Sequence, residues 1–486
     1  FEQYQNAKHR AASSANLCHL TEEEGGRFPM TGTGDTNLYA YFCELALSLR
    51  KEDGTIGLVV PAGIITDDAT QAFSRYVLAG RAKSIYPFNN TEQLFPIHTS
   101  YSFLLLTIAP SDRLDCVFYA TKIIHLDDPH RHVKFEKGDL ELFNPNTRTC
   151  VLARTQKDVD LCRKIYQSCP VLIQEKSNIQ NEVNPWGIRF LAMFHMSNDS
   201  ALFHESQDED NLTPLYEGKL FHQFDHRWAS YNGSTNSKGE QTPDECTLLV
   251  KQDFNYEITP RYWISENEVK SRTSEKKGMA AWEKPWSLVL RTITSTTNER
   301  TVICSVLPST WGLGHSASVI YPNKISETLV SCLLANINSL IVDYICRIKQ
   351  SGTNLNYFIF KQLPILPPER YSEANIDFIS SRVARLTRTS KSVADIWLTK
   401  YPSETFQPPA ERLRIRAELE AYYAKLYGLT REELQYILDP SAIMGDEYPS
   451  VTFPGLKRNE INELGEYLTQ RLVLDAYDKL ETGTLQ

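Results

Sequence analysis

The sequence predicts an α/β domain at its N-terminal end, followed by an α+β domain and a helical domain. Four apolar residues recur at i, i+4, i+7 and i+11 and would share one helix face: Leu38, Phe42, Leu45 and Leu49. Residues 56–60 (IGLVV) have the length and β-branched content of a buried strand of the parallel type. A second helix is expected over 67–78, and strands are expected over 83–88 and 100–108. Helix, buried strand, helix and strand in this order form one edge of a doubly wound sheet.

The remaining N-terminal residues fit the same domain. Residues 1–30 are polar and helix-prone and contain the run Glu22–Glu24, so we interpret them as a solvated linker. Further strands are expected over 114–120 and 132–135. A polar turn at 144–148 follows, and a helix is expected over 157–169. The first domain is therefore expected to span residues 1–146.

The sequence pattern changes after this turn and again near residue 369. From 150 to 368, short aromatic segments alternate with polar loops, which is typical of an α+β domain with small sheets. One long apolar helix is expected over 325–348. From residue 369 the chain has helical patterns, with a capping box formed by Thr430 and Glu433. We expect the second domain at 147–368 and the third at 369–486.

Length and composition agree with a globular protein of two or three domains. The chain has 486 residues, of which 41% are hydrophobic and 23% are charged, and its apolar stretches are too short or too polar to span a bilayer. The net charge of -9 is not that of a typical nucleic-acid binder, so a DNA-binding surface requires unevenly placed cations. The 10 cysteines form no CxxC pair, which predicts buried thiols in a reducing cytoplasm and no metal site.

Three motifs follow one another in the first domain: NLYAYF at 37–42, DGTIGLVVP at 53–61 and LFP at 94–96. Their order resembles the second half of the catalytic domain of gamma-class DNA adenine-N6 methyltransferases, above all those of type IIG restriction-modification and phage-defence proteins. Residues 352–368 resemble the end of target-recognition domains in these enzymes, and residues 416–439 resemble their C-terminal helical regions. The resemblance implies the edge of a Rossmann-like methyltransferase sheet, a DNA-reading domain and a helical C-terminal domain.

The resemblance also implies a function and partners. S-adenosylmethionine would donate a methyl group to adenine in double-stranded DNA, in the cytoplasm of a bacterium or archaeon. The family's glycine-rich cofactor loop and its (Asn/Asp/Ser)-Pro-Pro-(Tyr/Phe/Trp) motif have no match in residues 1–36. We therefore expect both in a preceding region of the same polypeptide, which would bind most of the cofactor and could carry a nuclease domain. The alternative is a non-catalytic DNA-binding or scaffolding subunit with a degenerate methyltransferase fold, working with other defence-system subunits.

Three residues of the first domain are candidates for the reaction centre. The resemblance places Phe95 against the flipped base, where an aromatic ring offsets the lost stacking by ~1–3 kcal/mol; a core phenylalanine is the alternative. The resemblance places Phe42 near the adenine ring of the cofactor, and plain core packing is the alternative. Pro61 ends the first strand at its carboxyl edge, where open α/β sheets bind ligands, or it only stops the strand.

The candidates for DNA contact lie in the second domain. Two segments combine a guanidinium with stacking rings, although interior packing is the commoner fate of such segments: Arg227 with Trp228, and Arg261 with Tyr262 and Trp263. Four loop residues are of types that bond base edges or phosphates: His315, Asn354, Asn356 and Lys361.

The histidines His222 and His226 have the i, i+4 spacing of a metal site, but the sequence around them suits base or phosphate contact better. No metal is therefore expected there. DNA binding would also require cations clustered on one surface, despite the net negative charge of the chain. We expect four of them to face the same cleft as Phe95: Arg227, Arg261, Lys349 and Lys361.

Overall fold

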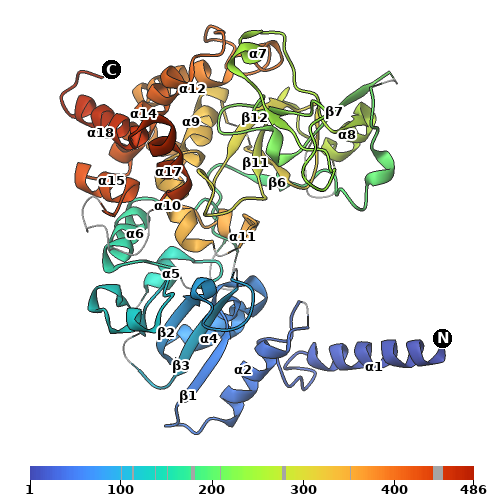
Figure 1. Ribbon diagram of the computed structural model, residues 1–486, viewed down its shortest axis with the longest axis vertical. Helices are drawn as coiled ribbons and strands as arrows, with labels where there is room; N and C mark the ends of the chain where they lie inside the picture. The colour runs from blue at the N-terminus through green and yellow to red at the C-terminus, as the bar shows by residue number, and fades with distance from the viewer. Residues whose placement is uncertain are drawn as a thin grey trace. The chain divides into compact units, whose positions relative to one another are not determined.

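The computed structural model describes residues 1–34, 36–99, 101–111, 114–136, 138–149, 151–176, 181–207, 210–275, 281–323, 325–350, 352–441 and 452–485. The chain folds into two compact units, unit 1 (Phe1–Gln167) and unit 2 (Ser168–Gln486), shown in Figure 1. The three-domain division of the sequence stays a prediction.

Unit 1 is built on a five-stranded sheet in the order β1-β3-β2-β4-β5. Its strands are β1 (Ile56–Pro61), β2 (Ala82–Asn89), β3 (Ser102–Ile108), β4 (Leu114–Cys116) and β5 (Val133–Phe135). Strand β3 is antiparallel to both β1 and β2, so β1 and β2 run in the same direction on either side of it. The connection from β1 to β2 contains the helices α3 (Gly63–Thr66) and α4 (Gln71–Leu78), as parallel strands require. Strands β2 and β4 are also parallel.

The strand positions confirm the sequence predictions closely, although Ser100, the expected first residue of β3, lies outside the described residues. The predicted environment of β1 is wrong, because β1 is a half-exposed strand at the edge of the described sheet. Its only hydrogen-bonded neighbour among the described strands is β3, and the Val59 side chain is 57% exposed. A continuous apolar run cannot show whether both faces of a strand are covered. The mixed sheet does not make a doubly wound sheet by itself, so that fold assignment stays a prediction.

Helix α2 (Leu38–Leu49) forms where the sequence predicts it, but it buries a different face. Its buried side chains are those of Ala40, Tyr41, Cys43 and Glu44. The Glu44 carboxylate accepts hydrogen bonds from the backbone N–H groups of Met30 and Thr31, which fixes the preceding loop on this helix. The predicted core face is exposed at Leu38, Phe42 and Leu49. Helix α1 (Glu2–Cys18) buries no residue, in agreement with a solvated N-terminal segment.

Two further helices complete unit 1. Helix α6 (Gln156–Ser168) confirms the predicted helix and is preceded by the short helix α5 (Asp139–Phe143). Arg163 of α6 donates to both carboxylate oxygens of Asp139, at 3.0 and 2.9 Å, and so ties the two helices together. The bidentate geometry makes this a strong ion pair.

Unit 2 contains three small sheets, as the α+β prediction requires. One has the order β12-β11-β14-β6, from Cys304–Pro308, Trp286–Arg291, Ala317–Tyr321 and Arg189–Leu191. A second has the order β10-β7-β13, from Tyr262–Ser265, Leu212–Tyr216 and Gly312–Leu313. The third pairs β8 (Ala229–Ser230) with β9 (Asp244–Glu245). The first two sheets share one hydrophobic core that includes Phe194, Leu215, Val289 and Val319. The short helices α7 (Leu248–Gln252) and α8 (Glu266–Thr273) lie among the loops.

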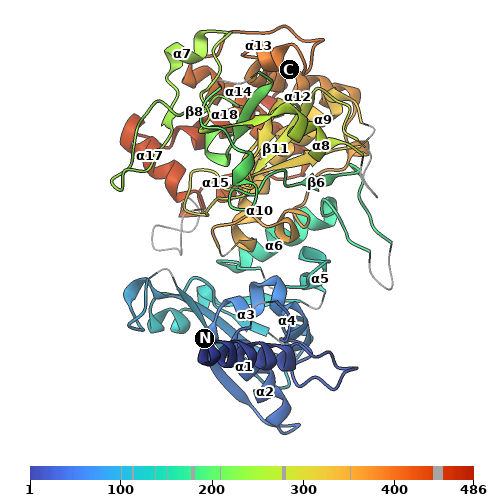
Figure 2. The same cartoon turned by 90° about the vertical axis from the view of Figure 1, so that its right-hand side faces the viewer.

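The helices of unit 2 gather on one side of these sheets, as Figure 1 shows, and Figure 2 views the unit from the sheet side. They are α9 (Glu327–Ile337), α10 (Leu340–Lys349), α11 (Tyr357–Phe360), α12 (Glu373–Thr387), α13 (Lys391–Ala394), α14 (Pro409–Leu426), α15 (Arg431–Leu438), α17 (Pro454–Leu464) and α18 (Leu468–Glu481). The capping box of Thr430 and Glu433 at the start of α15 is confirmed. Helices α9, α12 and α14 carry buried faces and form the second core of the unit.

The single helix predicted over 325–348 is wrong, because the chain breaks into α9 and α10 at Asn338 and Ser339. The Asn338 side chain bonds both the N–H and the C=O of Cys304 on β12, at 2.9 Å each. The Ser339 hydroxyl caps α10 by accepting from the Val342 N–H. Ser339 therefore satisfies an N–H that a continuous helix would bond itself, and Asn338 ties the break to β12.

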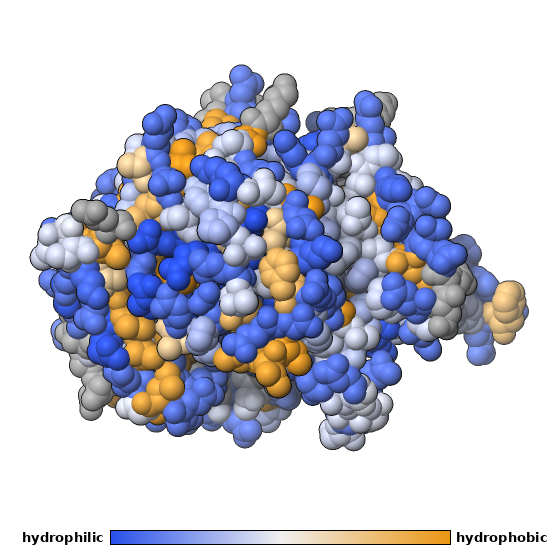
Figure 3. Space-filling model, turned by 90° about the horizontal axis from the view of Figure 1, so that it is seen from above, coloured by the Kyte–Doolittle hydropathy of each residue, from blue (hydrophilic) through white to orange (hydrophobic). Residues whose placement is uncertain are grey.

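Exposed apolar side chains occur in both units. No single helix among the described residues is long and apolar enough to cross a membrane. Taken together, the bent pair α9 and α10 has the length and composition of a membrane-spanning segment, but its residues are mostly buried in unit 2. The face in Figure 3 is largely hydrophilic, with hydrophobic residues in small groups.

Candidate nucleic-acid interface

Unit 1 places Pro61 and Phe95 against the same aromatic residue at one edge of the sheet. Pro61 pairs with Phe103 across β1 and β3, and Phe103 pairs with Phe88 across β3 and β2. The Phe88 and Phe103 rings stack with 5.2 Å between centroids, and Phe95 meets Phe103 edge-on at 4.8 Å. The parallel strands β1 and β2 both end at this edge, which is where α/β sheets bind ligands.

The loop that carries Phe95 is held by the buried side chain of Asn90. The Asn90 amide donates to the carbonyl oxygens of Phe95 and Ile97, at 3.0 and 3.1 Å, and its oxygen accepts from the Phe95 N–H at 3.0 Å. The backbone at Phe95 is therefore fixed, while its ring is 42% exposed. Leu94, Ile97 and Tyr101 are exposed beside it. A fixed, half-exposed ring is suited to stack on a flat group, and it differs from the core phenylalanine of the alternative interpretation.

Phe42 lies on the exposed face of α2, with 62% of its surface accessible. The alternative that Phe42 packs in the core is therefore wrong. Its ring is available to a flat partner, but one ring does not make a cofactor site. The role of Phe42 in cofactor binding stays a prediction.

Unit 1 also contains a partly buried polar cluster that the sequence did not suggest: Tyr86, Asp115 and His132. The Asp115 carboxylate accepts from the Tyr86 hydroxyl at 2.6 Å and lies 2.8 Å from His132 Nδ1, while His132 Nε2 lies 3.0 Å from the Leu126 carbonyl oxygen. Burial by itself lowers the pKa of His132. The hydrogen bonds to Asp115 and to the Leu126 carbonyl raise this pKa by more, so the pKa of His132 lies above its ordinary value. Burial and Asp115 raise the pKa of Tyr86 to about 12.

Arg227 does not face a cleft, which corrects the expectation that it contacts DNA. Its side chain is fully buried and donates to four carbonyl oxygens, those of Asp253, Tyr256, Lys251 and Thr389, at 2.7 to 2.9 Å. Such a guanidinium organises loops and has no free face for a phosphate. The ring of the next residue, Trp228, lies tilted against the His222 ring, with 4.5 Å between centroids, and lines a partly open cavity.

The two histidines near Arg227 are also interior residues. His226 Nε2 lies 2.9 Å from the Ser390 hydroxyl, and burial, with Arg227 nearby, lowers the pKa of His226 to about 3. No group of three metal-binding side chains exists among the described residues. The expected base or phosphate contact at His226 is wrong because the ring is enclosed.

Two of the predicted lysines are engaged within unit 2. Lys349 is buried and donates to the Gln362 carbonyl oxygen at 2.9 Å, so the expectation that it faces a cleft is wrong. Lys361 is partly exposed and pairs with Glu175 at 2.5 Å. A phosphate would have to compete with this carboxylate for Lys361.

The other predicted residues of unit 2 include three that meet on one surface. His315 is exposed and stacks on exposed His195, with 6.4 Å between ring centroids. Thr292 accepts from the Leu355 N–H through its carbonyl and donates from its hydroxyl to the His315 carbonyl oxygen. Ile293, half-exposed, forms a β-bridge with Asn354, and Asn356 is exposed two residues further on.

Two cations lie beside this surface. The Gly218 N–H donates to the Ser316 hydroxyl at 2.9 Å, which brings exposed Lys219 next to His315. The Lys219 ammonium lies 5.2 Å from the Tyr231 ring, and nearby Arg261 opposes the rise that burial and Glu217 cause in the Tyr231 pKa. The Arg261 guanidinium lies 5.0 Å from the ring of Tyr262. We call this set the polar strip: His195, Lys219, Arg261, Ile293, His315, Asn354 and Asn356.

Trp263 is only partly exposed, and its backbone forms a β-bridge with His204. We therefore do not include it in the polar strip. Sequence reasoning missed Asn90, Phe103, His195, Lys219 and Ile293. The position of Asn90 at the end of a strand, five residues before Phe95, is the one local signal that could have suggested a loop anchor. The others come together only through long-range pairing.

The solved structures similar to this chain include two restriction enzymes. The chain is similar to the type IIL restriction-modification enzyme MmeI, solved in complex with DNA, with a TM-score of 0.42, 12% identity and coverage of 82% of this chain and 50% of that one. It is also similar to the type IIG restriction endonuclease BpuSI, with a TM-score of 0.26, 12% identity and coverage of 86% and 51%. The chain therefore spans about half the length of either enzyme, and TM-scores this low assign it to neither fold. No protein-family model and no curated protein matches the sequence.

Proposed function

We propose that the chain supplies the flipped-base pocket and the DNA-reading surface of an adenine-N6 DNA methyltransferase in a restriction-modification or phage-defence system. The observation that carries the proposal is the ring of Phe95, half-exposed and fixed by Asn90 beside Pro61, where β1 and β2 end. An enzyme that modifies a base must take it out of the duplex, and an aromatic face then replaces the lost stacking.

The chain's part in the reaction is to position the base. Phe95 stacks on one face of the adenine, and Phe103 supports Phe95 from behind through their edge-on contact. The groups that bond the adenine amino nitrogen are those of the (Asn/Asp/Ser)-Pro-Pro-aromatic motif, which this sequence lacks. Catalysis of this kind depends on orientation more than on acid-base chemistry.

S-adenosylmethionine would supply the methyl group. The described residues fit it poorly, because Phe42 offers only one exposed ring and no described cavity lies beside it. We therefore assign most of the cofactor site to another region of the same polypeptide.

The same region would also cover the apolar surface of unit 1. Leu38, Phe42 and Leu49 are exposed on α2, and Val59 is exposed on the open edge strand β1. An edge strand with an exposed apolar side chain is a template for a further strand. A strand paired with β1 and packed on α2 would bury these residues and extend the sheet.

In unit 2, the polar strip is the proposed DNA-reading surface. Lys219 and Arg261 are exposed or partly exposed and so can reach phosphates, although a phosphate would have to compete with Glu217, which pairs with Lys219 at 3.3 Å. Asn354 and Asn356 can bond adenine through two hydrogen bonds, and the methyl groups of Ile293 suit the methyl group of thymine. The strip concentrates cations and amides on one surface of a chain with a net charge of -9.

The test is methyl transfer to adenine in duplex DNA by the natural polypeptide that contains this chain. We expect N6-methyladenine with the natural polypeptide, much less with its Phe95→Ala variant, and none with residues 1–486 alone. DNA binding without methylation by the natural polypeptide would favour the scaffolding alternative. Methylation by residues 1–486 alone would contradict the assignment of the catalytic motif to another region.

A further inference from the structure

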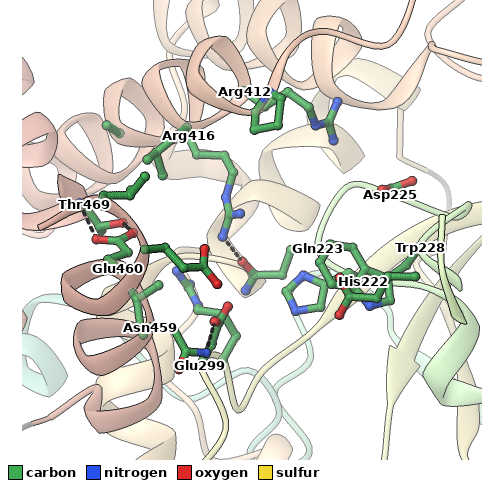
Figure 4. Close-up of a pocket in the computed structure, with 18 of the residues that line it drawn as sticks. His222, Gln223, Asp225, Trp228, Glu299, Arg412, Arg416, Asn459, Glu460 and Thr469 are labelled. Carbon is green, nitrogen blue, oxygen red and sulfur yellow. Dashed lines mark hydrogen bonds between the residues drawn. The ribbon is translucent and has the colours of Figure 1, made fainter. Parts of the chain in front are cut away.

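Unit 2 contains a cavity of about 460 Å³, partly open to solvent, where the loop 222–228 meets helices α14, α17 and α18 (Figure 4). The volume is within the range of small-molecule sites in proteins. Trp228 and His222 are the residues considered for DNA contact from the sequence that appear among the described residues lining it. The cavity therefore differs from the polar strip and from the Phe95 site.

Several charges that line the cavity are neutralised within the protein. Lys251 pairs with Asp225 at 2.7 Å, and Arg300 pairs with Asp343 at 2.9 Å and with Glu420 at 3.4 Å. Six other charged lining residues have no opposite charge within ion-pair distance among the described residues: Arg412, Arg416, Glu245, Glu299, Glu460 and Glu463. Four carboxylates against two guanidiniums leave an excess of two negative charges.

Arg416 provides a positive charge on the α14 side of the cavity. Its guanidinium donates to Gln223 Oε1 at 2.8 Å, and Figure 4 shows it pointing toward Gln223 across the cavity. The Gln223 amide nitrogen donates to the carbonyl oxygens of Val302 and Asn338, which holds its oxygen toward Arg416. Burial, and then the neighbouring Arg300, lower the pKa of Arg416 to about 10. The guanidinium is thus held in place by a neutral partner and forms no ion pair among the described residues, although Glu420 and Glu299 are close enough to oppose the fall in its pKa.

Carboxylates define the opposite side of the cavity. Glu460 accepts from the Thr469 N–H at 2.8 Å and from its hydroxyl at 2.5 Å, and Glu299 accepts from the Asn459 amide at 2.6 Å. Both are oriented by neutral donors. Burial raises the pKa of Glu460, and Glu299 raises it further. A cationic group between Glu299 and Glu460 would relieve this repulsion.

We propose that this cavity binds a small aliphatic molecule that carries a carboxylate and ammonium groups, with a net positive charge, as in a dibasic amino acid. Arg416 holds the carboxylate, and Glu299 and Glu460 hold ammonium groups. The net charge follows from the excess of two carboxylates in the lining. This proposal does not rest on methyltransferase activity, because the residues of unit 1 take no part in it.

A matched ligand series tests the proposal with the full chain. Calorimetry compares L-lysine, cadaverine, which lacks the carboxylate, and 6-aminohexanoate, which lacks the α-ammonium group. We expect lysine to bind tightest and each analogue to bind about tenfold or more weakly, since one charged hydrogen-bonding group is lost. Equal affinities for lysine and cadaverine, or no binding of any of the three at millimolar concentration, would overturn the proposal.

Two variants assign the charged groups. Arg416→Gln should weaken lysine binding about tenfold or more and leave cadaverine binding unchanged, whereas Glu460→Gln should weaken both. The matched controls are Arg414→Gln, exposed on the same helix and paired with Glu411, and Glu466→Gln, exposed and paired with Arg471. Equal losses in variants and controls would contradict the assignment. If a variant lowers the melting temperature strongly, the ligand series on the unchanged chain decides.

Discussion

Asn90 and Phe95 are joined by hydrogen bonds in both directions, because the Asn90 side chain donates to the Phe95 carbonyl and accepts from the Phe95 N–H. The backbone that carries the exposed Phe95 ring is thus fixed by two hydrogen bonds to a buried side chain. A buried residue determines where an exposed one points. Four predictions follow from this contact and from the other contacts described for the two units.

Phe95→Ala should weaken binding of the flipped base by ~1–3 kcal/mol, while Phe95→Trp keeps most of the affinity, because any flat ring can stack. The measurement compares the affinity of the natural polypeptide for duplexes with adenine or no base at the target position. Ile97→Ala, at a neighbouring exposed residue, is the control. Loss of folding or of cofactor binding in Phe95→Ala would favour a core role for this ring.

Asn90→Ala should reproduce much of this loss without touching the base. It removes three hydrogen bonds, and the unfolding free energy of unit 1 should fall by about 1–3 kcal/mol. Fluorescence of 2-aminopurine at the target position measures the flipped state, and denaturant unfolding measures stability. Asn90→Asp keeps the acceptor for the Phe95 N–H and should lie between the two. Unchanged fluorescence in Asn90→Ala would show that the loop does not depend on this anchor.

Lys219→Ala and Arg261→Ala should each lower the slope of log affinity against log salt by about one unit and leave sequence preference unchanged. Asn354→Ala should instead cost ~1–3 kcal/mol at a single target position. Arg471→Ala, at an exposed arginine of α18 paired with Glu466, is the control and should leave the slope unchanged. Slopes that do not change in either of the first two variants would exclude the polar strip as the phosphate-binding surface.

His132 should make unit 1 more stable in mild acid. Its folded pKa is above the ordinary value of 6.5, so its contribution is complete below 6.5 and is lost as pH rises through the folded pKa. Asp115, Asp128 and Leu126 favour the protonated ring, and burial opposes it. Melting temperatures measured across this pH interval should fall less in His132→Asn than in the natural chain. His9→Asn, on exposed α1, should keep the full dependence, and identical curves for all three proteins would contradict the role of His132.

The sequence was informative where local pattern decides and silent where long-range pairing decides. The boundaries of β2, β3, α6 and α15 follow from strand length, spacing and caps, and all were predicted closely. The buried face of α2 was not, because Glu44 is buried by its bonds to the loop at Met30 and Thr31 while Phe42 is left exposed. Arg227 shows the same limit, since a sequence cannot reveal that four carbonyl acceptors from two other segments, 251–256 and Thr389, surround one guanidinium.

The bonds of Arg227 also constrain how this protein can be re-engineered. Its guanidinium reaches Thr389, Arg300 reaches Glu420, and Gln223 accepts from Arg416, so buried charges join residues 168–368 to residues 369–486. Exchanging only the first segment with that of a relative would leave Glu420 without its arginine and Arg416 without the Gln223 oxygen. Transfer of the proposed DNA-reading surface to another protein would therefore require both segments together, residues 168–486.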